Sequence, residues 1–318
     1  MAEKSLLTIL KRRLNYNQSM NLNFSSAKSL ANFPKITIVT SSFNQGEYLE
    51  ETILSVLDQN YPNLEYIIID GGSTDNSVEI IKKYEKQLTY WISEKDNGLY
   101  DALNKGFSKS TGEIMAWINS DDLYHKKSLF TVAEIFSTFP KVQWIQGLPS
   151  FVNENGTLIS VSNFKKWTKY NYFLKDYKWI SQESCFWKRD LWEKANSKLN
   201  DTCQLAGDLD LWLRFFDYAE LYSVAIIFGA FRLRSNNQMS LEQMPAYENE
   251  AEYILNERLK KINPEEKRNL KKIISYQNFF GKIPWIRSKM YKNYLNNLQY
   301  PPSIYFDRYS QSFKMNEN

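Results

Sequence analysis

The chain has 318 residues, of which 43% are hydrophobic and 24% charged, and this composition excludes disordered and fibrous proteins. Its 40 basic and 36 acidic residues leave a formal net charge of +4, too small a bias for a dedicated nucleic-acid-binding protein. No segment approaches the roughly 18 uninterrupted apolar residues that a membrane-spanning helix needs. We therefore expect a globular chain built around one large unit.

The two cysteines and the N-terminus indicate a cytoplasmic protein. Cys185 and Cys203 have no metal-ligand spacing and cannot form a disulfide framework, so we expect buried, reduced thiols. The segment MAEKSLLTILKRRLNYNQ places basic residues after its short apolar stretch and has no small-residue cleavage site, which argues against a signal peptide. Residues 1–34 begin with a short helical stretch and become polar, so we interpret them as an N-terminal arm.

From Lys35 onward, strand-like and helix-like segments alternate. The expected strands are KITIVT, NLEYIIID, TYWIS and EIMAWI. The expected helices are GEYLEETILSVLDQN, STDNSVEIIKKYEK and GLYDALNKGFSKS, the last with Tyr100, Leu103 and Phe107 on one face. This alternation predicts a mostly parallel sheet with helices on both faces.

The alternation weakens after residue 140. WIQGLPSFVNENGTLISV is typical of a hairpin with an Asn-Gly turn. ISQESCFWKRDLWEKA and AGDLDLWLRFFDYA each predict a polar loop that runs into a helix. We expect a main domain over residues 35–240 and, over residues 241–318, a helical extension with basic faces, interrupted at Pro264, Pro284 and the Pro301-Pro302 pair.

Polar segments follow the four expected strands, namely SSFNQG, DGGSTD, EKDNG and NSDD. In open parallel sheets, ligands bind outside the carboxyl ends of the strands. We therefore expect these four segments to converge on one crevice.

Asp121 and Asp122 stand side by side after the fourth strand. Adjacent carboxylates repel each other unless a cation lies beside them, and their oxygens suit Mg²⁺ or Mn²⁺. Because Mg²⁺ commonly completes its shell with phosphate oxygens, the expected partner is a diphosphate. The alternative is that NSDD simply caps the next helix. His125, the single histidine, is either a further ligand or a surface residue at a helix start.

The motifs together resemble the inverting, metal-dependent nucleotide-sugar glycosyltransferases of family 2, of the bacterial polysaccharide-biosynthesis type, which have the GT-A fold. The resemblance covers roughly residues 35–240. It rests on the order of VTSSFNQGEYLEETILSVLDQNYPNLEYIIIDGGSTDNS, SEKDNGLYDALNKG, GEIMAWINSDD, QESCFWKRDLWEKA, AGDLDLWLRFF and GAFRLRSNNQMS. It implies a Rossmann-like, mostly parallel sheet followed by a helical region.

The resemblance also implies roles for matching positions. Asp70 would accept a hydrogen bond from the base of the nucleoside. The positions implied to line the nucleotide and diphosphate are Ser41, Asn44, Asp70, Gly72, Asp96, Asn104 and Lys105. NSDD occupies the place of the Asp-x-Asp metal signature of the family, with Asn119 replacing its first aspartate. Asp121 is then the metal ligand, and Ser120 and Asp122 belong to the donor site.

Asp208 falls where the family places its catalytic base. A glycosidase needs an acid and a base, but a sugar diphosphate already carries a good leaving group whose charge a metal can neutralise. One base is then sufficient, to take the proton from an acceptor hydroxyl that attacks the anomeric carbon opposite the diphosphate. Without the resemblance, Asp208 is better interpreted as a helix cap, and Asp210 is a weaker rival within the helix.

SQESCFW matches the acceptor-side loop of the family, so Gln182 and Glu183 are candidates for contacts with acceptor or sugar hydroxyls. Several aromatic side chains offer stacking faces for sugars or belong to the core. They are Trp167, Tyr170, Tyr172, Trp179, Trp187 and Trp212.

One position departs from the family, because the resemblance leads us to expect a histidine where Arg234 stands. Arginine cannot ligate a metal, but its fork of donors can pair with phosphate oxygens. We predict that Arg232 or Arg234 helps to hold the diphosphate and makes the contribution of the metal smaller. Unaltered donor affinity and turnover in Arg234→Ala would contradict this prediction.

The C-terminal segments RLKKINPEEKRNLKK and FFGKIPWIRSKMYKNYL combine aromatic and basic residues. This combination suits peripheral association with the inner face of a membrane, where many members of the family act on lipid-linked sugars, or a solvated helical flank.

The leading functional hypothesis is transfer of a sugar, with inversion, from a UDP-, dTDP- or GDP-sugar to a hydroxyl of a glycan or lipid-linked acceptor. Mn²⁺ or Mg²⁺ is the expected cofactor, and no nucleic-acid partner is expected. A sugar nucleotidyltransferase is an alternative, but SSFNQGEY lacks its Gly-rich, basic loop. A non-catalytic nucleotide-sugar or glycan-binding protein is supported by Asn119 and opposed by Asp121, Asp122 and Asp208.

Overall fold

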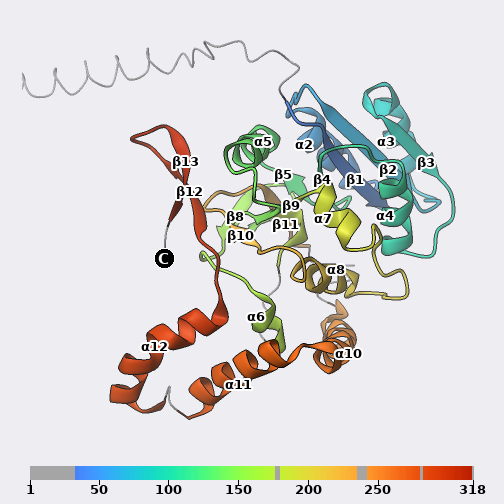
Figure 1. The fold of residues 1–318 in the computed structure, drawn as a ribbon. Coiled ribbons are helices and arrows are strands. Elements are labelled where there is room, and N and C mark those ends of the chain that lie inside the picture. Colours follow the sequence, from blue (N-terminus) through green and yellow to red (C-terminus); the bar gives the residue numbers. More distant parts are fainter. Residues whose placement is uncertain (1–32, 176–179, 235–241, 280–281, 317–318) are drawn as a thin grey trace, which may run out of the picture. The chain divides into compact units, whose positions relative to one another are not determined.

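The computed structural model describes residues 33–175, 180–234, 242–279 and 282–316, and Pro34–Asn318 forms one compact unit (Figure 1). Residues 1–32 of the expected N-terminal arm, Trp179 and the expected domain boundary at residue 240 lie outside these described ranges.

A seven-stranded sheet forms the centre of the unit, in the order β10-β6-β9-β4-β1-β2-β3. Its strands are β1 (Ile36–Ser42), β2 (Leu64–Asp70), β3 (Tyr90–Ser93), β4 (Ile114–Trp117), β6 (Trp144–Gln146), β9 (Cys185–Lys188) and β10 (Tyr222–Ser223). β1 pairs in parallel with β2 and β4, β2 with β3, and β6 with β10. The four predicted strands and the mostly parallel sheet are confirmed.

β9 is a strand that the sequence did not predict, because SQESCFWKRD was expected to be a loop leading into a helix. It lies antiparallel between β4 and β6. Cys185, Phe186 and Trp187 are all fully buried. A short strand that is buried on both faces has no polar-apolar alternation, so its periodicity does not reveal it.

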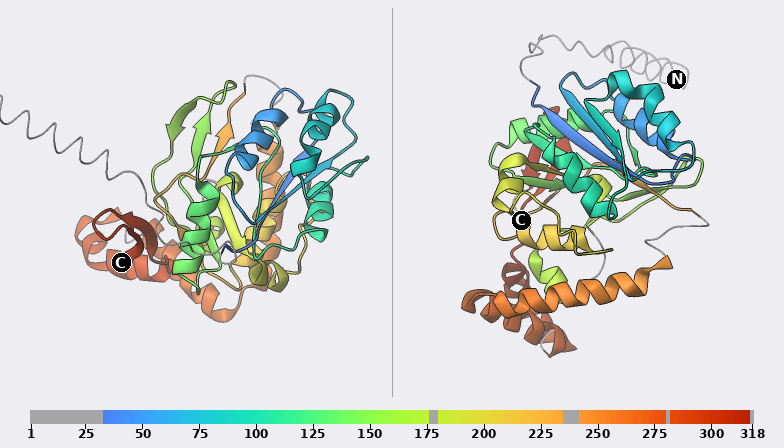
Figure 2. Two further views of the ribbon diagram at one scale, coloured as in Figure 1. Left: turned by 90° about the horizontal axis from the view of Figure 1, so that it is seen from above. Right: turned by 90° about the vertical axis from the view of Figure 1, so that its right-hand side faces the viewer.

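Among the described residues, seven α-helices precede the C-terminal region, and several of them flank the sheet (Figure 2). They are α2 (Leu49–Leu57), α3 (Ser77–Tyr84), α4 (Leu99–Ser108), α5 (Ser128–Thr138), α6 (Lys169–Phe173), α7 (Arg189–Lys194) and α8 (Gly207–Phe215). The predicted apolar face of α4 is buried. Gly106 lets α4 approach the sheet closely, because a Cβ there would lie 2.4 Å from Cγ1 of Val39.

A second sheet has the order β5-β11-β7-β8. Its strands are β5 (Leu123–Tyr124), β7 (Ser150–Val152), β8 (Leu158–Val161) and β11 (Gly229–Arg232). β7 and β8 form the predicted hairpin, with Gly156 at φ +72° in its turn. β5 follows directly on residues 119–122, here called the NSDD loop, and pairs with β11. This pairing brings Arg232 next to the NSDD loop.

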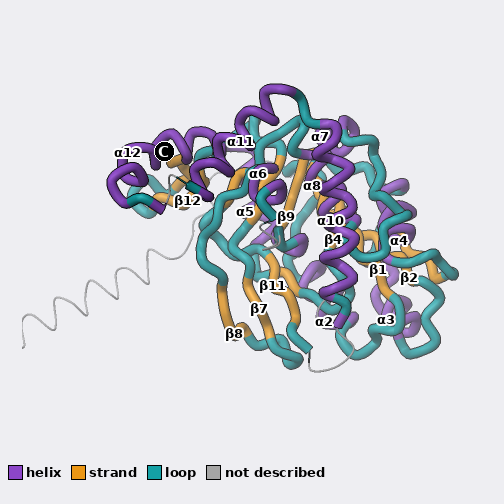
Figure 3. The backbone as a smooth tube through the Cα atoms, turned by 90° about the horizontal axis from the view of Figure 1, so that it is seen from below, coloured by secondary structure: helices purple, strands orange, loops and turns teal. Residues whose placement is uncertain are grey.

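The C-terminal region contains α10 (Met244–Lys261), α11 (Pro264–Asn278) and α12 (Pro284–Leu298), as expected, followed by β12 (Ser303–Asp307) and β13 (Ser312–Asn316) (Figure 3). The antiparallel β12–β13 hairpin contradicts the expectation of helix throughout this region. Ile304 of β12 forms a β-bridge with Val224, a long-range contact that local sequence does not reveal. Within the described part of the chain, no helix is long and apolar enough to cross a membrane.

Candidate active site

The polar segments that follow β1, β2 and β3 lie side by side, as predicted. Ser42 pairs with Asp70, and Asp70 pairs with Ser93, so these strands end level with one another. The backbone N–H of Asn44 donates to Oγ of Ser73 over 2.8 Å, and the backbone N–H of Thr74 donates to Oδ1 of Asn44 over 2.8 Å. Asn44 therefore joins the first two segments.

Asp70 holds the DGGS turn together. Its fully buried carboxylate accepts hydrogen bonds from the backbone N–H of Ser73 (2.9 Å), from the hydroxyl of Ser73 (2.6 Å) and from the hydroxyl of Ser93 (2.7 Å). The backbone N–H of Gly72, a residue at φ +83°, donates to the same carboxylate. With both oxygens engaged, Asp70 supports the turn instead of offering an open acceptor. Ser41, at the end of β1, is buried.

Asp96 and Lys105 lie at the side of this turn. Oδ1 of Asp96 accepts from the backbone N–H of Gly98 over 2.9 Å. Gly71 leaves room for Asp96, because a Cβ at Gly71 would lie 2.7 Å from Oδ2 of Asp96. Lys105 forms an ion pair with Glu94 over 3.1 Å and stays partly exposed.

Asn104 was expected to face the nucleotide, but its side chain is engaged elsewhere. Its Nδ2 donates to the carbonyl of Leu199 over 3.0 Å, and its Oδ1 accepts from the backbone N–H of Leu199 over 2.8 Å. Both ends of the Asn104 amide are therefore bonded to the backbone of Leu199. These bonds fix the segment that leads to α8. The structure therefore places Asn104 in a supporting position.

Asp121 and Asp122 have different surroundings despite their adjacency. Oδ2 of Asp121 pairs with Nη2 of Arg234 over 2.9 Å. The buried Asp122 accepts from the backbone N–H of Arg232 over 3.0 Å, from Nδ2 of Asn119 over 3.2 Å and from Nε2 of Gln182 over 3.4 Å. Asp121 is thus the carboxylate available for a charged ligand, and Asp122 fixes the loop. Ser120, which precedes Asp121, is buried.

Burial acts strongly on both carboxyls. It raises the pKa of Asp121 above its usual value, against the opposing charge of Arg234. Burial raises the pKa of Asp122 further, and the nearby charge of Asp121 adds to that increase. This pair is therefore more stable with a cation beside it, as expected for adjacent carboxylates.

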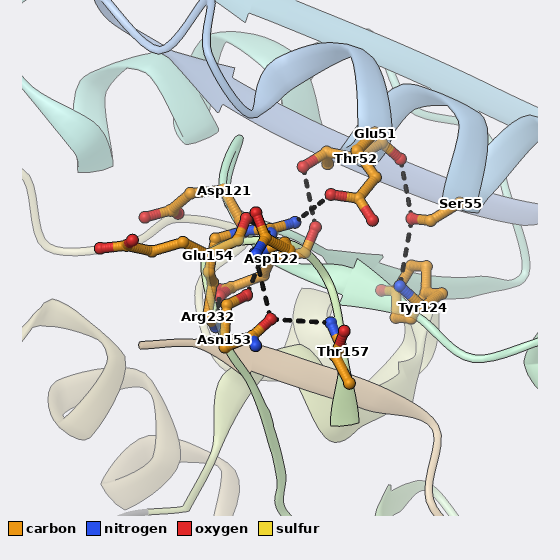
Figure 4. A network of polar contacts seen from close by, with 11 residues as sticks. Glu51, Thr52, Ser55, Asp121, Asp122, Tyr124, Asn153, Glu154, Thr157 and Arg232 are labelled. Carbon is orange, nitrogen blue, oxygen red and sulfur yellow. Dashed lines mark hydrogen bonds and ion pairs between the residues drawn. The ribbon is translucent and has the colours of Figure 1, made fainter. Parts of the chain in front are cut away.

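Arg232 ties the NSDD loop to its surroundings (Figure 4). Its side chain is fully buried, and Nε donates to the carbonyl of Asp121 over 2.7 Å. Nη1 donates to the carbonyls of Asn153 and Glu154, and Nη2 pairs with Glu51 on α2 over 2.7 Å. All three of its guanidinium nitrogens are therefore committed to the protein. Of the two predicted alternatives for the diphosphate, Arg232 or Arg234, this leaves Arg234 as the candidate.

Arg234 lies beside Asp121 and is the candidate for pairing with a diphosphate. Its side chain keeps 9% exposure beside Asp121. Nη1 donates to Oε1 of Gln45 over 3.2 Å, and the guanidinium lies 5.4 Å from the ring centroid of Tyr48. Arg234 therefore connects the segment after β1 with the NSDD loop.

The residues around Asp121 fit a divalent metal only in part. Within the described ranges, no group of three His, Cys, Asp or Glu side chains is placed to hold a metal ion. Nε2 of His125 forms a hydrogen bond with the hydroxyl of Ser150 over 2.8 Å, which gives no support to ligation by His125. One carboxylate plus two phosphate oxygens and water is nevertheless a common Mg²⁺ shell. The donor set therefore suits a metal that arrives with a diphosphate.

Three buried oxygens near Asp122 have no hydrogen-bond partner among the described residues: Oδ1 of Asn119, Oε1 of Gln182 and Oε1 of Glu183. Burial raises the pKa of Glu183 to about 7. Buried polar atoms normally have hydrogen-bond partners. The oxygens of Asn119 and Gln182 can only accept hydrogen bonds, whereas the carboxyl of Glu183 can accept or, when protonated, donate. The three oxygens are therefore unused acceptors in the interior beside Asp122.

Asp208 lies in the first turn of α8. Its Oδ1 accepts from the backbone N–H of Leu209 over 2.8 Å and from the hydroxyl of Tyr247 over 3.2 Å. Burial raises the pKa of Asp208 to about 6, although both hydrogen bonds oppose this increase. A carboxylate with a pKa close to neutrality is suited to accept a proton. Its rival Asp210 forms an ion pair with Arg214 on the same helix.

The aromatic candidates belong to the core. Trp167, Tyr170, Tyr172, Trp187 and Trp212 are each at most 3% exposed. Such side chains have no open face for a sugar, so the core interpretation is correct for them.

Several residues of the site carried no signal in the sequence. Gln45 and Glu51 contact the two arginines, and Tyr247 and Glu250 contact the segment around Asp208. Glu51 resembles any acidic residue in a first helical turn. Tyr247 and Glu250 lie in the region assigned to a separate helical extension.

Comparison with known proteins identifies the family of the main domain. Residues 37–189 match the family described as glycosyl transferase family 2. An uncharacterized glycosyltransferase of Nostoc is 36% identical over 107 residues, which cover 33% of this chain and 33% of that protein. The putative teichuronic acid biosynthesis glycosyltransferase TuaG of Bacillus subtilis is 36% identical over 99 residues, covering 30% of this chain and 39% of TuaG. The chain thus spans well under half the length of these curated relatives.

Solved structures show the same fold. TarS of S. aureus, residues 1–349 in complex with UDP-GlcNAc, superimposes with a TM-score of 0.55 and 17% identity, covering 89% of this chain and 97% of that one. The same fragment in complex with UDP gives a TM-score of 0.54, with 16% identity and the same coverage. The predicted GT-A fold is confirmed, and residues 37–189 belong to glycosyl transferase family 2.

Proposed function

We propose that this protein transfers a sugar from a nucleotide-diphosphate donor to a hydroxyl of a glycan or lipid-linked acceptor, in the synthesis of a bacterial surface polysaccharide. The observation that carries the proposal is the Asp121–Arg234 pair at the carboxyl ends of the parallel strands in a family 2 domain. It supplies one group for a metal and one for phosphate oxygens at the place where such sheets bind ligands.

The reaction needs one proton acceptor and one stabilised leaving group. Asp208 accepts the proton of the acceptor hydroxyl while the oxygen of that hydroxyl forms a bond to the anomeric carbon. The bond from that carbon to the diphosphate breaks on the opposite face, so the configuration inverts and the nucleoside diphosphate departs. Arg234 pairs with the diphosphate oxygens as their charge develops.

Asp121 would hold Mn²⁺ or Mg²⁺, which supplies charge neutralisation of the leaving diphosphate when bound. In the donor-free protein Asp121 already pairs with Arg234. Arg234 must release Asp121 for both groups to bind their ligands. We therefore expect the metal and the nucleotide sugar to bind together more tightly than either binds alone.

A uridine nucleotide is the proposed donor. TarS structures are described with UDP-GlcNAc and with UDP, and a relative from Staphylococcus epidermidis, 30% identical over 125 residues, is named poly-β-1,6-N-acetyl-D-glucosamine synthase. That segment covers 39% of this chain and 30% of the synthase. The three unpartnered acceptors near Asp122 support a sugar rich in hydroxyl or amide donors.

The test is incubation of the purified full-length protein with a panel of UDP-, dTDP- and GDP-sugars and glycan acceptors, with and without Mn²⁺. Nucleotide release and thermal shift are measured together. We expect release with a UDP-sugar, abolished in Asp208→Asn while the thermal shift with the donor persists. Binding without release across suitable acceptors would instead favour the non-catalytic binding protein, which the neutral Asn119 supports.

We also propose that the C-terminal region associates with the inner, cytoplasmic face of a membrane. Residues 267–300 contain eight lysines and arginines and no acidic residue. Within the same stretch Phe279 is 66% exposed and Trp285 72% exposed. Basic and exposed aromatic side chains together match an anionic lipid surface, and a second copy of so basic a region would be repelled.

Vesicle flotation tests this association. We expect binding to vesicles that contain phosphatidylglycerol, weaker binding to purely zwitterionic vesicles, and a clear reduction in the double variant Phe279→Ser/Trp285→Ser. The matched control is Tyr253→Ser, which removes a 68% exposed aromatic side chain outside this stretch. Equal flotation with and without anionic lipid, or none with either, would contradict the proposal.

A further inference from the structure

The segment that leads into Asp208 is held by a helix from the C-terminal region. This segment, residues 204–207, is here called the base loop. Glu250 on α10 accepts hydrogen bonds from three consecutive backbone N–H groups of the base loop: Gln204 over 2.8 Å, Leu205 over 2.7 Å and Ala206 over 2.6 Å. One carboxylate thus satisfies the donors that precede α8, which has no capping side chain of its own.

The same face of α10 reaches Asp208 itself. Tyr247 lies three residues before Glu250, and residues at this spacing are neighbours on a helix surface. Its hydroxyl donates to Oδ1 of Asp208 over 3.2 Å. Figure 3 shows α10 running beside α8, in agreement with these contacts.

The base loop is also held from the opposite side, by α4. The hydroxyl of Tyr100 donates to the carbonyl of Leu205 over 2.6 Å. The ring of Tyr100 packs on Gly207, where a Cβ would come within 2.8 Å of it. The base loop therefore has little freedom to shift Asp208 relative to the sheet.

We propose that α10 is part of the catalytic apparatus, with Tyr247 and Glu250 acting as positioning residues for Asp208. Tyr247 orients the carboxylate, and Glu250 fixes the backbone that presents it. This inference rests on the proposed role of Asp208 as the general base.

Tyr247 and Glu250 act on Asp208 in opposite electrostatic directions. The hydroxyl of Tyr247 stabilises the charged carboxylate and lowers its pKa, whereas the negative charge of Glu250 raises it. The other titratable groups that face Asp208 are Tyr100 on α4, Cys185 on β9 and Cys203 before the base loop. Burial raises the pKa of each of these three groups, so they stay neutral near pH 6. Asp210, two residues further along α8, forms an ion pair with Arg214.

The experiment compares Tyr247→Phe and Glu250→Gln in the full-length protein, using kcat/KM across pH 5–9 with a UDP-sugar and acceptor. The acidic limb of this profile reports the base in the free enzyme. We expect Tyr247→Phe to move the limb to higher pH and to lower kcat about tenfold, with the donor KM unchanged. Glu250→Gln should move the limb to lower pH, while its remaining carbonyl oxygen still accepts part of the loop bonds.

Matched controls lie on the same helix. Tyr253→Phe and Glu248→Gln make the same chemical changes at exposed positions of α10 and should leave the profile unchanged. In the Asp208→Asn background, Tyr247→Phe should have no further effect on turnover, because it acts through Asp208.

The outcomes separate the two proposals. Substantial turnover in Asp208→Asn would overturn the base assignment itself. Loss of turnover in Asp208→Asn, with no shift of the acidic limb in Tyr247→Phe, would overturn the role of α10 alone. If Glu250→Gln fails to fold, the limb position and kcat of Tyr247→Phe decide the question, because that change removes a single oxygen.

Discussion

The two acidic sites of this protein are built in opposite ways. Asp121 and Asp122 lie at a strand end among arginines, which contact them through Arg234 and through the backbone of Arg232. Asp208 lies at a helix start, and its hydrogen-bond partners among the described residues are a backbone N–H and the neutral hydroxyl of Tyr247. The first site thus places a charged partner beside its carboxylates, whereas the second gives its carboxylate neutral partners only.

This difference follows the chemistry that each site has to perform. A group that binds a diphosphate or a metal must stay charged, and cations beside a carboxylate favour its charged form. A general base must gain and lose a proton near the working pH, so a strong cationic partner would make it too weak a base. Removing one residue at a time should therefore affect the two sites in different measurements.

The largest effect is expected for Asp208→Asn. Turnover should fall about a thousandfold, since the amide cannot accept the proton, while donor binding persists. Because the pKa of Asp208 is held near 6, above the ordinary 3.8, its ionisation opposes folding at high pH and stops doing so below about pH 4. The variant should therefore be more stable than the parent at pH 8, by about 3 kcal/mol, and similar at pH 4. Chemical denaturation at both pH values checks this, and equal stability differences would contradict it.

Arg232→Met should destabilise the fold by about 3 kcal/mol, because the carbonyls of Asp121, Asn153 and Glu154 lose the buried guanidinium that donates to them. Urea denaturation measures this loss. The matched variant Arg234→Met, at the other arginine beside the NSDD loop, should cost less, because Arg234 makes fewer contacts, namely the ion pair with Asp121 and the bond to Gln45. Equal losses at the two positions would show that the arginines do not have separate roles.

Arg234→Gln should weaken binding of the nucleotide sugar about 10- to 100-fold, because a charged donor to the diphosphate is lost. Mn²⁺ binding to the donor-free protein should become tighter, since Asp121 no longer pairs with Arg234. Isothermal titration with UDP-sugar and electron paramagnetic resonance of Mn²⁺ measure the two changes. Movement of both affinities in the same direction would contradict competition between Arg234 and the metal.

Asn104→Ala should have the smallest effect, a loss of about 1 kcal/mol in stability from its two bonds to Leu199. Donor affinity should remain close to that of the parent, as expected for a supporting position. A drop in donor affinity larger than tenfold would instead restore Asn104 to the nucleotide site.

The sequence by itself determined four of the seven strands of the central sheet, most of the helices around it and the family of the domain. Local hydrophobic periodicity predicts strands β1 to β4 and helix α4. The parallel topology of the strands then predicts that the polar segments after them lie close together. The sequence did not predict β9 or the β12–β13 hairpin. β9 is short and buried on both faces, so it shows no polar-apolar pattern. The hairpin depends on a long-range bridge through Ile304.

Only the tertiary structure decided which polar residues face a ligand and which hold the site together. Arg232 and Arg234 are two residues apart in one motif, yet one is buried among carbonyls and the other lies beside Asp121. Asn104 and Asp70 were expected to contact the donor, but their hydrogen bonds go to the protein. Tyr247 reaches Asp208 from 39 residues away. Local sequence encodes backbone conformation, whereas the partner of a polar side chain is set by the atoms that folding brings to it from distant segments.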